Sequence, residues 1–249
     1  MPQGSAPARE AIRESQFAVK SSKLVAPFRR VILIAAVVVV VKVPWLSTKK
    51  AQAALRKTIT LELAFHVATY KGKAVADDAY LDARVAKANE IYAPYGVAFV
   101  RADAVQELAE EHAELEDRAA RNALTPLATG RKRGVIDCFV VRQFKDVGNP
   151  NTYRRGVHWH SQTRAGTHFI ILSASYGGVD VLAHELGHFL GNPQHSETPG
   201  NLMSYQRGPM LPFMDAGQLR KVEGALRTYL ARRELRPAKP RPVAAAEEK

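Results

Sequence analysis

Cysteine is nearly absent from this chain, since Cys138 is the only one among 249 residues. An intrachain disulfide is therefore excluded. No cysteine lies near the apolar segment 31–46, which argues against a lipoprotein anchor. Cys138 itself lies in the apolar run VIDCFVV, where we expect a buried structural thiol rather than a reactive one.

Several signatures of other protein classes are also lacking. We find no zinc-finger spacing, no aromatic and basic RNA-binding signature, no acidic loop of EF-hand spacing and no internal repeat. Most of the net charge of +12 lies at the start, because residues 1–56 carry ten Lys and Arg against two Glu, whereas residues 57–249 carry 26 basic and 22 acidic residues. We therefore expect a globular domain with a solvated surface and no nucleic-acid partner.

Only one long apolar run is present, VILIAAVVVVV at residues 31–41, and two arginines directly precede it. As a helix this run extends about 16 Å, which is short for a hydrocarbon core of about 30 Å. Residues 51–53, Ala-Gln-Ala, supply a small-x-small cleavage pattern. We expect an export signal within residues 1–56, with an uncleaved membrane anchor through 31–46 as the alternative. Both place the domain outside the cytoplasm, in a secreted or periplasmic protein.

From Lys57 onward the pattern alternates between short apolar runs and helical stretches. Residues 58–68 alternate like a strand, residues 76–96 have helical spacing, and residues 97–105 return to strand, which predicts a β-α-β unit. The charged stretch 106–123 is expected to form a solvated helical insertion. Further strands are expected at 135–144, 156–160 and 166–174, and a last helix with a capping box from Asp215 to Gln218.

The run VDVLAHELGHFLG predicts a helix that begins near Asp180 and ends at Gly191. Within it, His184 and His188 are four residues apart and lie on one face, so their imidazoles can converge on one ion at about 2.0 to 2.1 Å. Glu185 lies one residue further round, near the ion but not bound to it.

The residues after this helix complete the predicted zinc site. Gly191 can adopt a positive φ that turns the chain sharply and returns His195 as a third ligand. Three neutral histidines leave a zinc position open to water, which is typical of catalytic sites. Zinc lowers the pKa of such a water to about 7, and a carboxylate at Glu185 can take its proton. We therefore expect hydrolysis of a peptide bond.

Ordinary core histidines are the alternative interpretation of this motif. Five fixed positions in this order arise by chance on the order of once in a hundred thousand chains of this length. The metal-site interpretation is therefore favoured.

The stretch HELGHFLGNPQH resembles the HExxHxxGxxH signature of the metzincin zinc metallopeptidases, with three residues instead of two between Gly191 and His195, and NLMSY at 201–205 resembles their Met-turn. The resemblance covers residues 57–236 and is strong over 181–205. It implies an α+β fold, with a twisted mixed sheet and helices in an upper subdomain and a small C-terminal subdomain with one helix. It also implies an endopeptidase with zinc in the cleft and a protein or peptide substrate. Residues 237–249 are expected to form a disordered tail.

Features of two metzincin groups are mixed in this chain. Ser196, directly after the third histidine, and the eight positions from His195 to Met203 resemble the matrixins. The Met-Ser-Tyr sequence resembles the serralysins and astacins, in which a tyrosine approaches the zinc. Met203 is implied to be structural, beneath the metal. For Tyr205 two roles stay open: binding the metal or stabilising the oxyanion, and lining the pocket.

A further group of histidines occurs in GVHWH, where His158 and His160 alternate on one face of the expected strand, with His168 nearby in the next. In metzincins the matching region is the edge strand that pairs with substrate, and matrixins place a second, structural zinc close by. The upstream His-x-Asp partner is missing here. We therefore expect an exposed polar edge rather than a second metal ion.

Two function classes are compatible with these motifs. The first is an exported zinc endopeptidase, and the second is a zinc-stabilised binding module on a metzincin scaffold that does not cut. Glu185 favours the endopeptidase, because a module without catalysis has no chemical need for that carboxylate. The apolar residues of the stretch QRGPMLPFMD, at 206–215, suggest an apolar substrate pocket.

Overall fold

The computed structural model describes residues 58–238. The export signal or anchor predicted within residues 1–56 lies outside this part of the chain, as do residues 239–249. None of the helices between residues 58 and 238 is long and apolar enough to cross a membrane.

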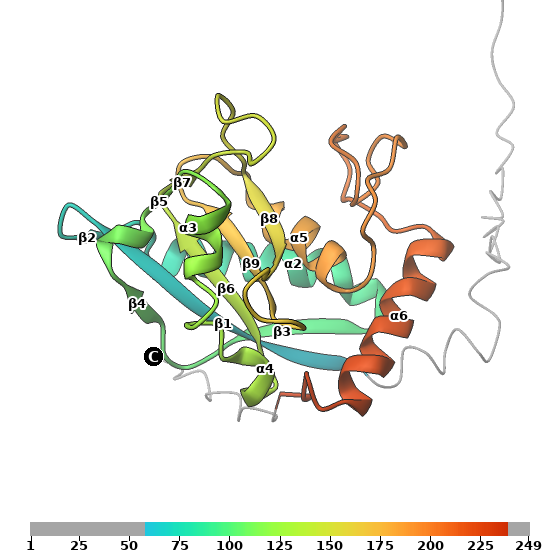
Figure 1. The fold of residues 1–249 in the computed structure, drawn as a ribbon. Helices are drawn as coiled ribbons and strands as arrows, with labels where there is room; N and C mark the ends of the chain where they lie inside the picture. Colours follow the sequence, from blue (N-terminus) through green and yellow to red (C-terminus); the bar gives the residue numbers. More distant parts are fainter. Residues whose placement is uncertain (1–57, 239–249) are drawn as a thin grey trace, which may run out of the picture. The chain divides into compact units, whose positions relative to one another are not determined.

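A twisted mixed sheet and five α-helices make up the domain (Figure 1). The strands of the main sheet are β1 (Ile59–Tyr70), β2 (Lys73–Ala74), β3 (Val97–Arg101), β4 (Gln106–Leu108), β6 (Ile136–Val141), β8 (Gly156–His160) and β9 (His168–Ser173). A second sheet pairs β5 (Glu114–Leu115) with β7 (Gln143–Phe144). The helices are α2 (Asp78–Tyr92), α3 (Arg118–Ala123), α4 (Gly130–Arg133), α5 (Val181–Phe189) and α6 (Ala216–Ala231), with 3-10 turns η2 (Ala93–Tyr95) and η3 (Glu110–His112).

Strand β1 lies at the centre of the sheet topology. It pairs in parallel with β3 and β4 along one edge and with β6 along the other, and β9 continues the sheet in parallel beyond β6. Strand β8 runs antiparallel to β9 and forms the outer edge. The predicted β-α-β unit is confirmed as β1-α2-β3, and the predicted α+β class with a mixed sheet is also confirmed.

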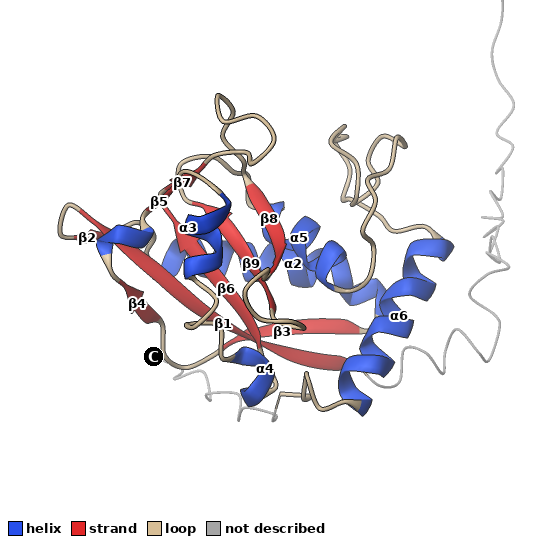
Figure 2. Cartoon of the chain, in the orientation of Figure 1, coloured by secondary structure: helices blue, strands red, loops and turns tan. Residues whose placement is uncertain are grey.

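Helices cover both faces of the sheet (Figure 2). Helices α2, α5 and α6 pack on one face, in a core that includes Leu81, Leu186 and Val222. Helix α3 lies over the other face, beside a second cluster around Phe139 and Phe169. Alternate side chains of each strand enter these two cores, which explains why β6 is buried along its whole length. Cys138 is buried within it, as predicted.

Helix α2 packs against α5. Asp77 caps α2, since its side chain accepts a hydrogen bond from the backbone N–H of Tyr80 at 2.8 Å. At the other end, the fully buried Tyr92 donates its hydroxyl hydrogen to the carbonyl of Ala183 in α5 at 3.1 Å. Burial raises the pKa of this phenol far above its ordinary value, so the hydroxyl stays a donor.

The prediction of a helical insertion over 106–123 is wrong. Only residues 118–123 are α-helical and residues 110–112 form the single 3-10 turn η3, whereas β4 pairs in parallel with β1 and β5 pairs with β7. Leu108, Ala113 and Leu115 are buried in the second core. Their spacing does not place them on one face of a helix. Several acidic residues lie between them, so the stretch looks like a solvated helix and its buried positions are not recognised from sequence.

The C-terminal part after α5 contains one helix, α6, as predicted. Its capping box is present: Asp215 accepts from the backbone N–H of Gln218 at 2.8 Å, and the Gln218 side chain accepts from the backbone N–H of Asp215 at 3.0 Å. The chain then returns to the sheet, where Pro237 pairs with Leu61 and the N–H of Ala238 donates to Thr60 at 2.8 Å. The first two residues of the predicted tail are thus held by β1.

Candidate metal centre and active site

Helix α5 carries two of the three predicted zinc ligands. It begins after Asp180, and its apolar side chains are buried against the sheet. This packing sets the orientation of the helix. His184 and His188 extend from it with their ring centroids 4.8 Å apart and their ring planes nearly perpendicular. The helix ends where Gly191 has φ 97°, a conformation that favours glycine. The turn brings His195 back, with its ring centroid 4.8 Å from that of His188.

The three histidines form a group that fits a metal ion. One ring nitrogen of each lies within 4.8 Å of the others. The Nε2 atoms of His188 and His195 are 3.2 Å apart, close to the separation of about 3.3 Å that two nitrogens have around a tetrahedral zinc. These residues also have the required chemistry, since zinc commonly binds imidazole nitrogens.

Backbone carbonyls orient two of the rings. Nδ1 of His184 lies 2.7 Å from the carbonyl oxygen of Leu202, and Nδ1 of His188 lies 2.7 Å from that of Asn192. Each Nδ1–H therefore donates to a carbonyl, and each Nε2 lone pair remains available, the arrangement common among metal-binding histidines. Burial also lowers the pKa of His184, to about 4, so the ring stays neutral and able to bind a cation.

Glu185 is buried beside the histidines. Loss of hydration raises the pKa of its carboxyl to about 8, against the lowering effects of the His158 backbone N–H and of the charges on Arg154 and Arg207. Edge strand β8 lies directly against it, because a Cβ built on Gly156 would be 2.7 Å from Glu185 Oε1. A glycine at 156 therefore allows the strand to approach the carboxyl closely.

Met203 lies beneath α5, as the resemblance implies for a Met-turn residue. It is fully buried, and a Cβ on Gly187 would collide with its sulfur. The Met203 carbonyl accepts a hydrogen bond from the backbone N–H of Ser196 at 3.0 Å. This bond connects the Met-turn to the segment that carries His195.

An amide pair fixes the Met-turn to α6. Asn201 and Gln218 are buried and exchange two side-chain hydrogen bonds of 2.9 Å each. The Asn201 side chain also accepts from the backbone N–H of Met203 at 2.9 Å. The cap of α6 and the Met-turn below the histidines are thus parts of one polar network.

Arg207 connects the start of α5 to the same turn. Its Nε forms an ion pair with Asp180 at 2.7 Å, and its Nη1 donates to the carbonyls of Leu202 and Ser204 at 3.0 and 2.7 Å. Since Leu202 also accepts from His184, Arg207 holds the carbonyl that orients a predicted zinc ligand.

Tyr205 and the following loop border the histidines. The Tyr205 ring is 66% exposed and stacks on His195, with centroids 4.3 Å apart. Further on, Met210, Leu211 and Phe213 are exposed apolar side chains, whereas Met214 is buried and bonded through its N–H to the Tyr95 hydroxyl at 2.8 Å. The loop therefore presents apolar side chains from an anchored base.

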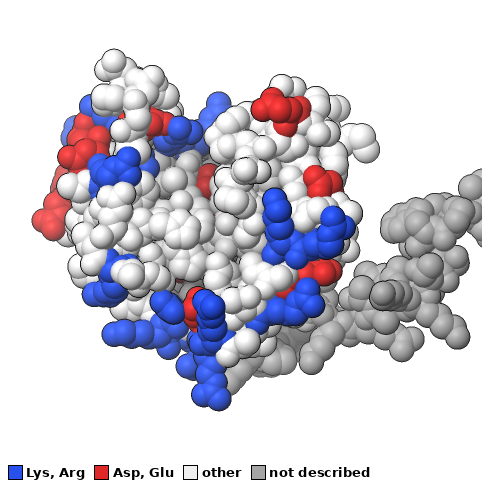
Figure 3. Space-filling model, turned by 45° about the vertical axis from the view of Figure 1, so that its right-hand side comes forward, with Lys and Arg blue, Asp and Glu red and all other residues white. Residues whose placement is uncertain are grey.

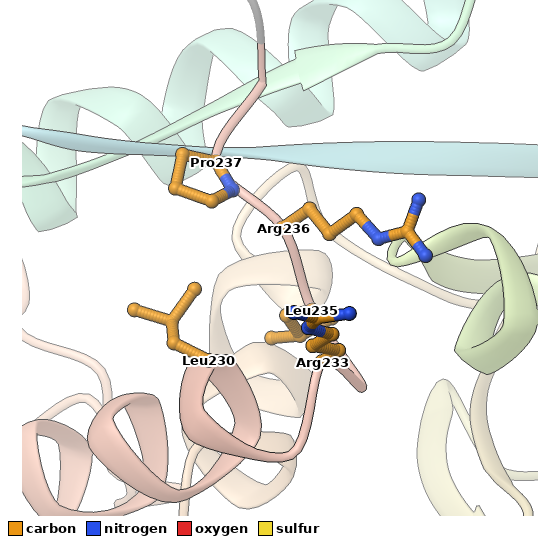
Figure 4. Close-up of a pocket in the computed structure, with 5 residues that line it drawn as sticks. All are labelled: Leu230, Arg233, Leu235, Arg236 and Pro237. Carbon is orange, nitrogen blue, oxygen red and sulfur yellow. The ribbon is translucent and has the colours of Figure 1, made fainter.

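A separate hollow of about 480 Å³ lies at the other end of α6. Figure 4 shows its lining, which consists of Leu230, Arg233, Leu235, Arg236 and Pro237. These residues include no histidine or carboxylate, so the hollow offers no metal ligand set. On the face shown in Figure 3, Lys and Arg lie around the margins, most densely along the lower edge, and the hollowed centre is largely uncharged.

The histidines of the edge strand differ from the expected exposed polar edge. His160 is exposed, but His158 and His168 are half-buried on the helix-facing side. Burial lowers the pKa of His168 to about 4 and that of His158 well below its ordinary value, so both rings are neutral. Together the three form a second group whose ring nitrogens lie within 4.8 Å of one another.

Sequence reasoning missed the residues that support the site. Gly156, Asn201 and Arg207 act through contacts with elements distant in the chain. Gly156 opens the stretch GVHWH and Asn201 opens NLMSY, so two of the three lie in stretches that the sequence analysis singles out. Neither stretch indicates which residue its first member contacts.

No protein-family model matches this sequence, and no curated protein matches it. Solved structures do resemble the fold. Mirolysin in complex with compound 9 superposes with a TM-score of 0.54 at 13% identity, over 72% of this chain and 96% of that chain. Mature mirolysin from Tannerella forsythia in complex with a cleaved peptide gives 0.50 at 13% identity, over 72% and 99%. Metalloproteinase-II from Bacteroides fragilis gives 0.44 at 15% identity, over 68% and 53%.

The fold is that of the metzincin-type metallopeptidases, as the motif and the Met-turn predict. At these identities the likeness concerns the fold, and the chemistry is argued from the site itself.

Proposed function

We propose that this protein is a zinc-dependent endopeptidase. The observation that carries the proposal is the convergence of His184, His188 and His195 beside the buried carboxyl of Glu185. Two Nδ1 atoms of the group are bonded to carbonyls, so the site is oriented for a cation before one binds. Mirolysin of this fold has been solved with a cleaved peptide, which supports a protein or peptide substrate.

His184, His188 and His195 would hold the zinc through ring nitrogens. When bound, zinc supplies a Lewis acid that lowers the pKa of water to about 7 and polarises a peptide carbonyl. The Glu185 carboxyl then releases its own proton more readily, because an adjacent positive charge favours the carboxylate. One Glu185 oxygen takes the proton from the attacking water and afterwards delivers it to the nitrogen of the leaving amine.

Two further elements suit a peptide substrate. Strand β8 is the last strand of the sheet on its side, so an extended peptide can add beside it as a further strand. The exposed Leu211 and Phe213 provide apolar contacts for a substrate side chain. We assign oxyanion stabilisation to the hydroxyl of Tyr205, because its ring stacks on that of His195.

The experiment is hydrolysis of an unfolded, casein-like protein by the purified chain, with and without a metal chelator. We expect cleavage that the chelator abolishes and added zinc restores, because the proposed mechanism requires the zinc that the three histidines would hold. Cleavage that survives complete metal removal contradicts the proposal. Tight zinc binding without cleavage of any peptide supports the binding module instead.

We also propose export from the cytoplasm, on the grounds of the two arginines, the apolar run 31–41 and the Ala-Gln-Ala sequence at 51–53. The mature protein is expected to begin near Ala54, or to remain attached to the membrane with its domain outside. N-terminal sequencing of the protein recovered from each cell fraction checks this, and an intact, soluble cytosolic chain contradicts both versions.

A further inference from the structure

An arginine lies just before edge strand β8, on the side of the chain that faces the candidate active site. Gly156 opens β8 against Glu185, since a Cβ built on this glycine would be 2.7 Å from Glu185 Oε1. Arg154 precedes Gly156 by two residues, and the carbonyl of Arg155 between them accepts from the N–H of Ser173 at 2.9 Å, in continuation of the β8–β9 register. Side chains two residues apart on an extended chain project to the same side, about 7 Å apart.

A backbone bond and an ion pair fix the position of Arg154. Its backbone N–H donates to the carbonyl of Phe144 at 2.9 Å, and its Nε donates to the carboxylate of Asp146. Asp146 is itself held, because its other oxygen accepts from the N–H groups of Gly148 and Asn149 at 2.6 and 3.1 Å. The bond from Gly148 keeps the pKa of Asp146 below its ordinary value, so the partner of Arg154 remains a carboxylate.

The outer end of this guanidinium keeps donors for a ligand. Asp146 takes the Nε hydrogen, and neither Nη atom of Arg154 donates to another group within residues 58–238. The side chain is 47% exposed, so these donors can be reached from solvent. The planar fork of an arginine matches the two oxygens of a carboxylate.

The charge on Arg154 acts on the metal centre, whereas that of its partner does not. Burial raises the pKa of Glu185, and the Arg154 charge opposes this effect. Burial and then the Arg154 charge lower the pKa of His195, against the raising effect of Glu197. Asp146 has no comparable effect on Glu185 or His195. The guanidinium therefore lies between Asp146 and the metal centre.

Two neighbouring arginines do not combine these features. Arg207 uses Nε for Asp180 and Nη1 for two carbonyls, and its Nη2 lies 3.5 Å from Nδ1 of His184. Arg155 is offset by one residue from Arg154 and therefore projects to the opposite side of the extended chain, together with Val157 of the second core. Arg154 thus brings both a nearby charge and free donors to the site.

We propose that Arg154 is a specificity-determining residue, which binds a carboxylate of the substrate close to the scissile bond and makes the enzyme prefer acidic substrates. This inference rests on the proposed peptidase function and names its substrate class. A peptide that adds beside β8 passes from Glu185 to Arg154 within about two residues, because an extended chain advances about 3.3 Å per residue. An Asp or Glu side chain and a C-terminal carboxylate offer Arg154 the same chemistry.

Matched peptides with amidated C-termini test the preference on the purified, zinc-loaded chain. Glu is placed at successive positions on both sides of the scissile bond and compared there with Gln and Lys. At one position we expect kcat/KM for Glu to exceed that for Gln by about five- to fiftyfold, a range reduced by the partial exposure of Arg154. The difference should lie mainly in KM, because the carboxylate is bound equally before and during the reaction.

A further pair of peptides distinguishes the two sources of the carboxylate. Neutral peptides that end at successive positions after the scissile bond are compared with a free C-terminus and as amides. Preference for the free C-terminus over its amide assigns the terminal carboxylate to Arg154, and preference for internal Glu assigns an acidic side chain.

Variants separate recognition from structural support. Arg154→Gln should abolish the preference, whereas Arg154→Lys should keep part of it because the charge remains. Asp146→Asn breaks the ion pair but leaves the cation, so the preference should persist. Arg155→Gln removes the same charge from the opposite side of the chain and is the matched control. A merely structural role predicts that Arg154→Gln and Asp146→Asn lower kcat alike, whatever the charge of the peptide.

Binding distinguishes failure of this proposal from failure of the proposed function. Glu185→Gln lacks the base, so its affinity for labelled Glu, Gln and Lys peptides can be measured by fluorescence anisotropy without cleavage. The Glu peptide should bind about five- to fiftyfold more tightly than the Gln peptide. This difference should shrink in about 1 M salt, where charges are screened over about 3 Å, and vanish when Arg154→Gln is added.

The proposal is overturned if the Glu, Gln and Lys peptides bind equally or not at all, or if the preference survives Arg154→Gln. Cleavage of peptides by the wild type without regard to their charge would sustain the proposed function and remove this inference. Acidic peptides that bind through Arg154 but are never cleaved would have the reverse meaning.

Discussion

Replacing Glu185 with Gln is expected to lower peptide hydrolysis by about two to four orders of magnitude, which is the usual contribution of a general base. The amide keeps the size of the carboxyl but cannot take a proton from water. Zinc content and fold should be unchanged, because Glu185 is not a ligand and is buried beside β8. The measurement is turnover on one peptide, beside zinc content and melting temperature, for wild type and variant.

Two comparison variants sharpen this test. Glu223→Gln makes the same chemical change on the exposed side of α6 and should leave turnover at the wild-type value. Tyr205→Phe removes only a hydroxyl and should lower turnover by roughly ten- to a thousand-fold with zinc retained, if that hydroxyl stabilises the oxyanion. Wild-type activity in Glu185→Gln would show that the carboxyl is not the base and that the mechanism is wrong.

The helix that carries this chemistry could be predicted from sequence because its signals are local. The apolar spacing of α5, the glycine at its end and the two histidines four residues apart all lie within one continuous stretch. The capping box of α6 is equally local, since Asp215 and Gln218 are three residues apart. Both helices were predicted close to their observed positions.

Strand pairing over long sequence distances was the main source of error. The segment from Gln106 to Leu115 contains few apolar residues, and its two short strands exist because β1 and β7 provide partners. Strand propensity depends strongly on such context, whereas charge-rich composition favours a helix in isolation. Within the predicted stretch 106–123, only α3 at Arg118–Ala123 has the predicted α-helical form.

The residues that hold the candidate metal centre in place could not be predicted from the sequence for a similar reason, because their partners are distant in the chain. Gln218 reads locally as a helix cap, yet the same side chain bonds to Asn201 and thereby positions the Met-turn. His158 and His168 read as an exposed edge, because a strand's alternation does not reveal which face the helices cover. Asp180 reads as a helix start, and its ion pair with Arg207 becomes visible only in the folded chain.

Removing the zinc ligands of α5 is the remaining change with a large expected effect. His184→Ala and His188→Ala should each reduce zinc affinity at the catalytic site by well over about a hundredfold and abolish turnover, since even outer contacts of a metal site are worth about 10- to 100-fold. Both rings belong to α5 and are oriented by carbonyls at 2.7 Å, and an alanine at either position removes a nitrogen that is already oriented for the metal.

His195→Ala should have a smaller effect on zinc than either of these. His195 lies on the segment after the Gly191 turn rather than on α5, and it is more exposed than His184. The two helical ligands therefore remain in place, and we expect zinc affinity to fall by about 10- to 100-fold with partial activity at high zinc.

Zinc is titrated into the stripped protein, and bound metal and peptide hydrolysis are followed together. The matched control is His112→Ala, because it removes an imidazole that does not belong to the group of His184, His188 and His195. Unchanged zinc affinity in the His184 and His188 variants would show that the metal is bound elsewhere. A larger loss of zinc affinity in His195→Ala than in these two variants would mean that the segment after Gly191, and not α5, provides the dominant ligand.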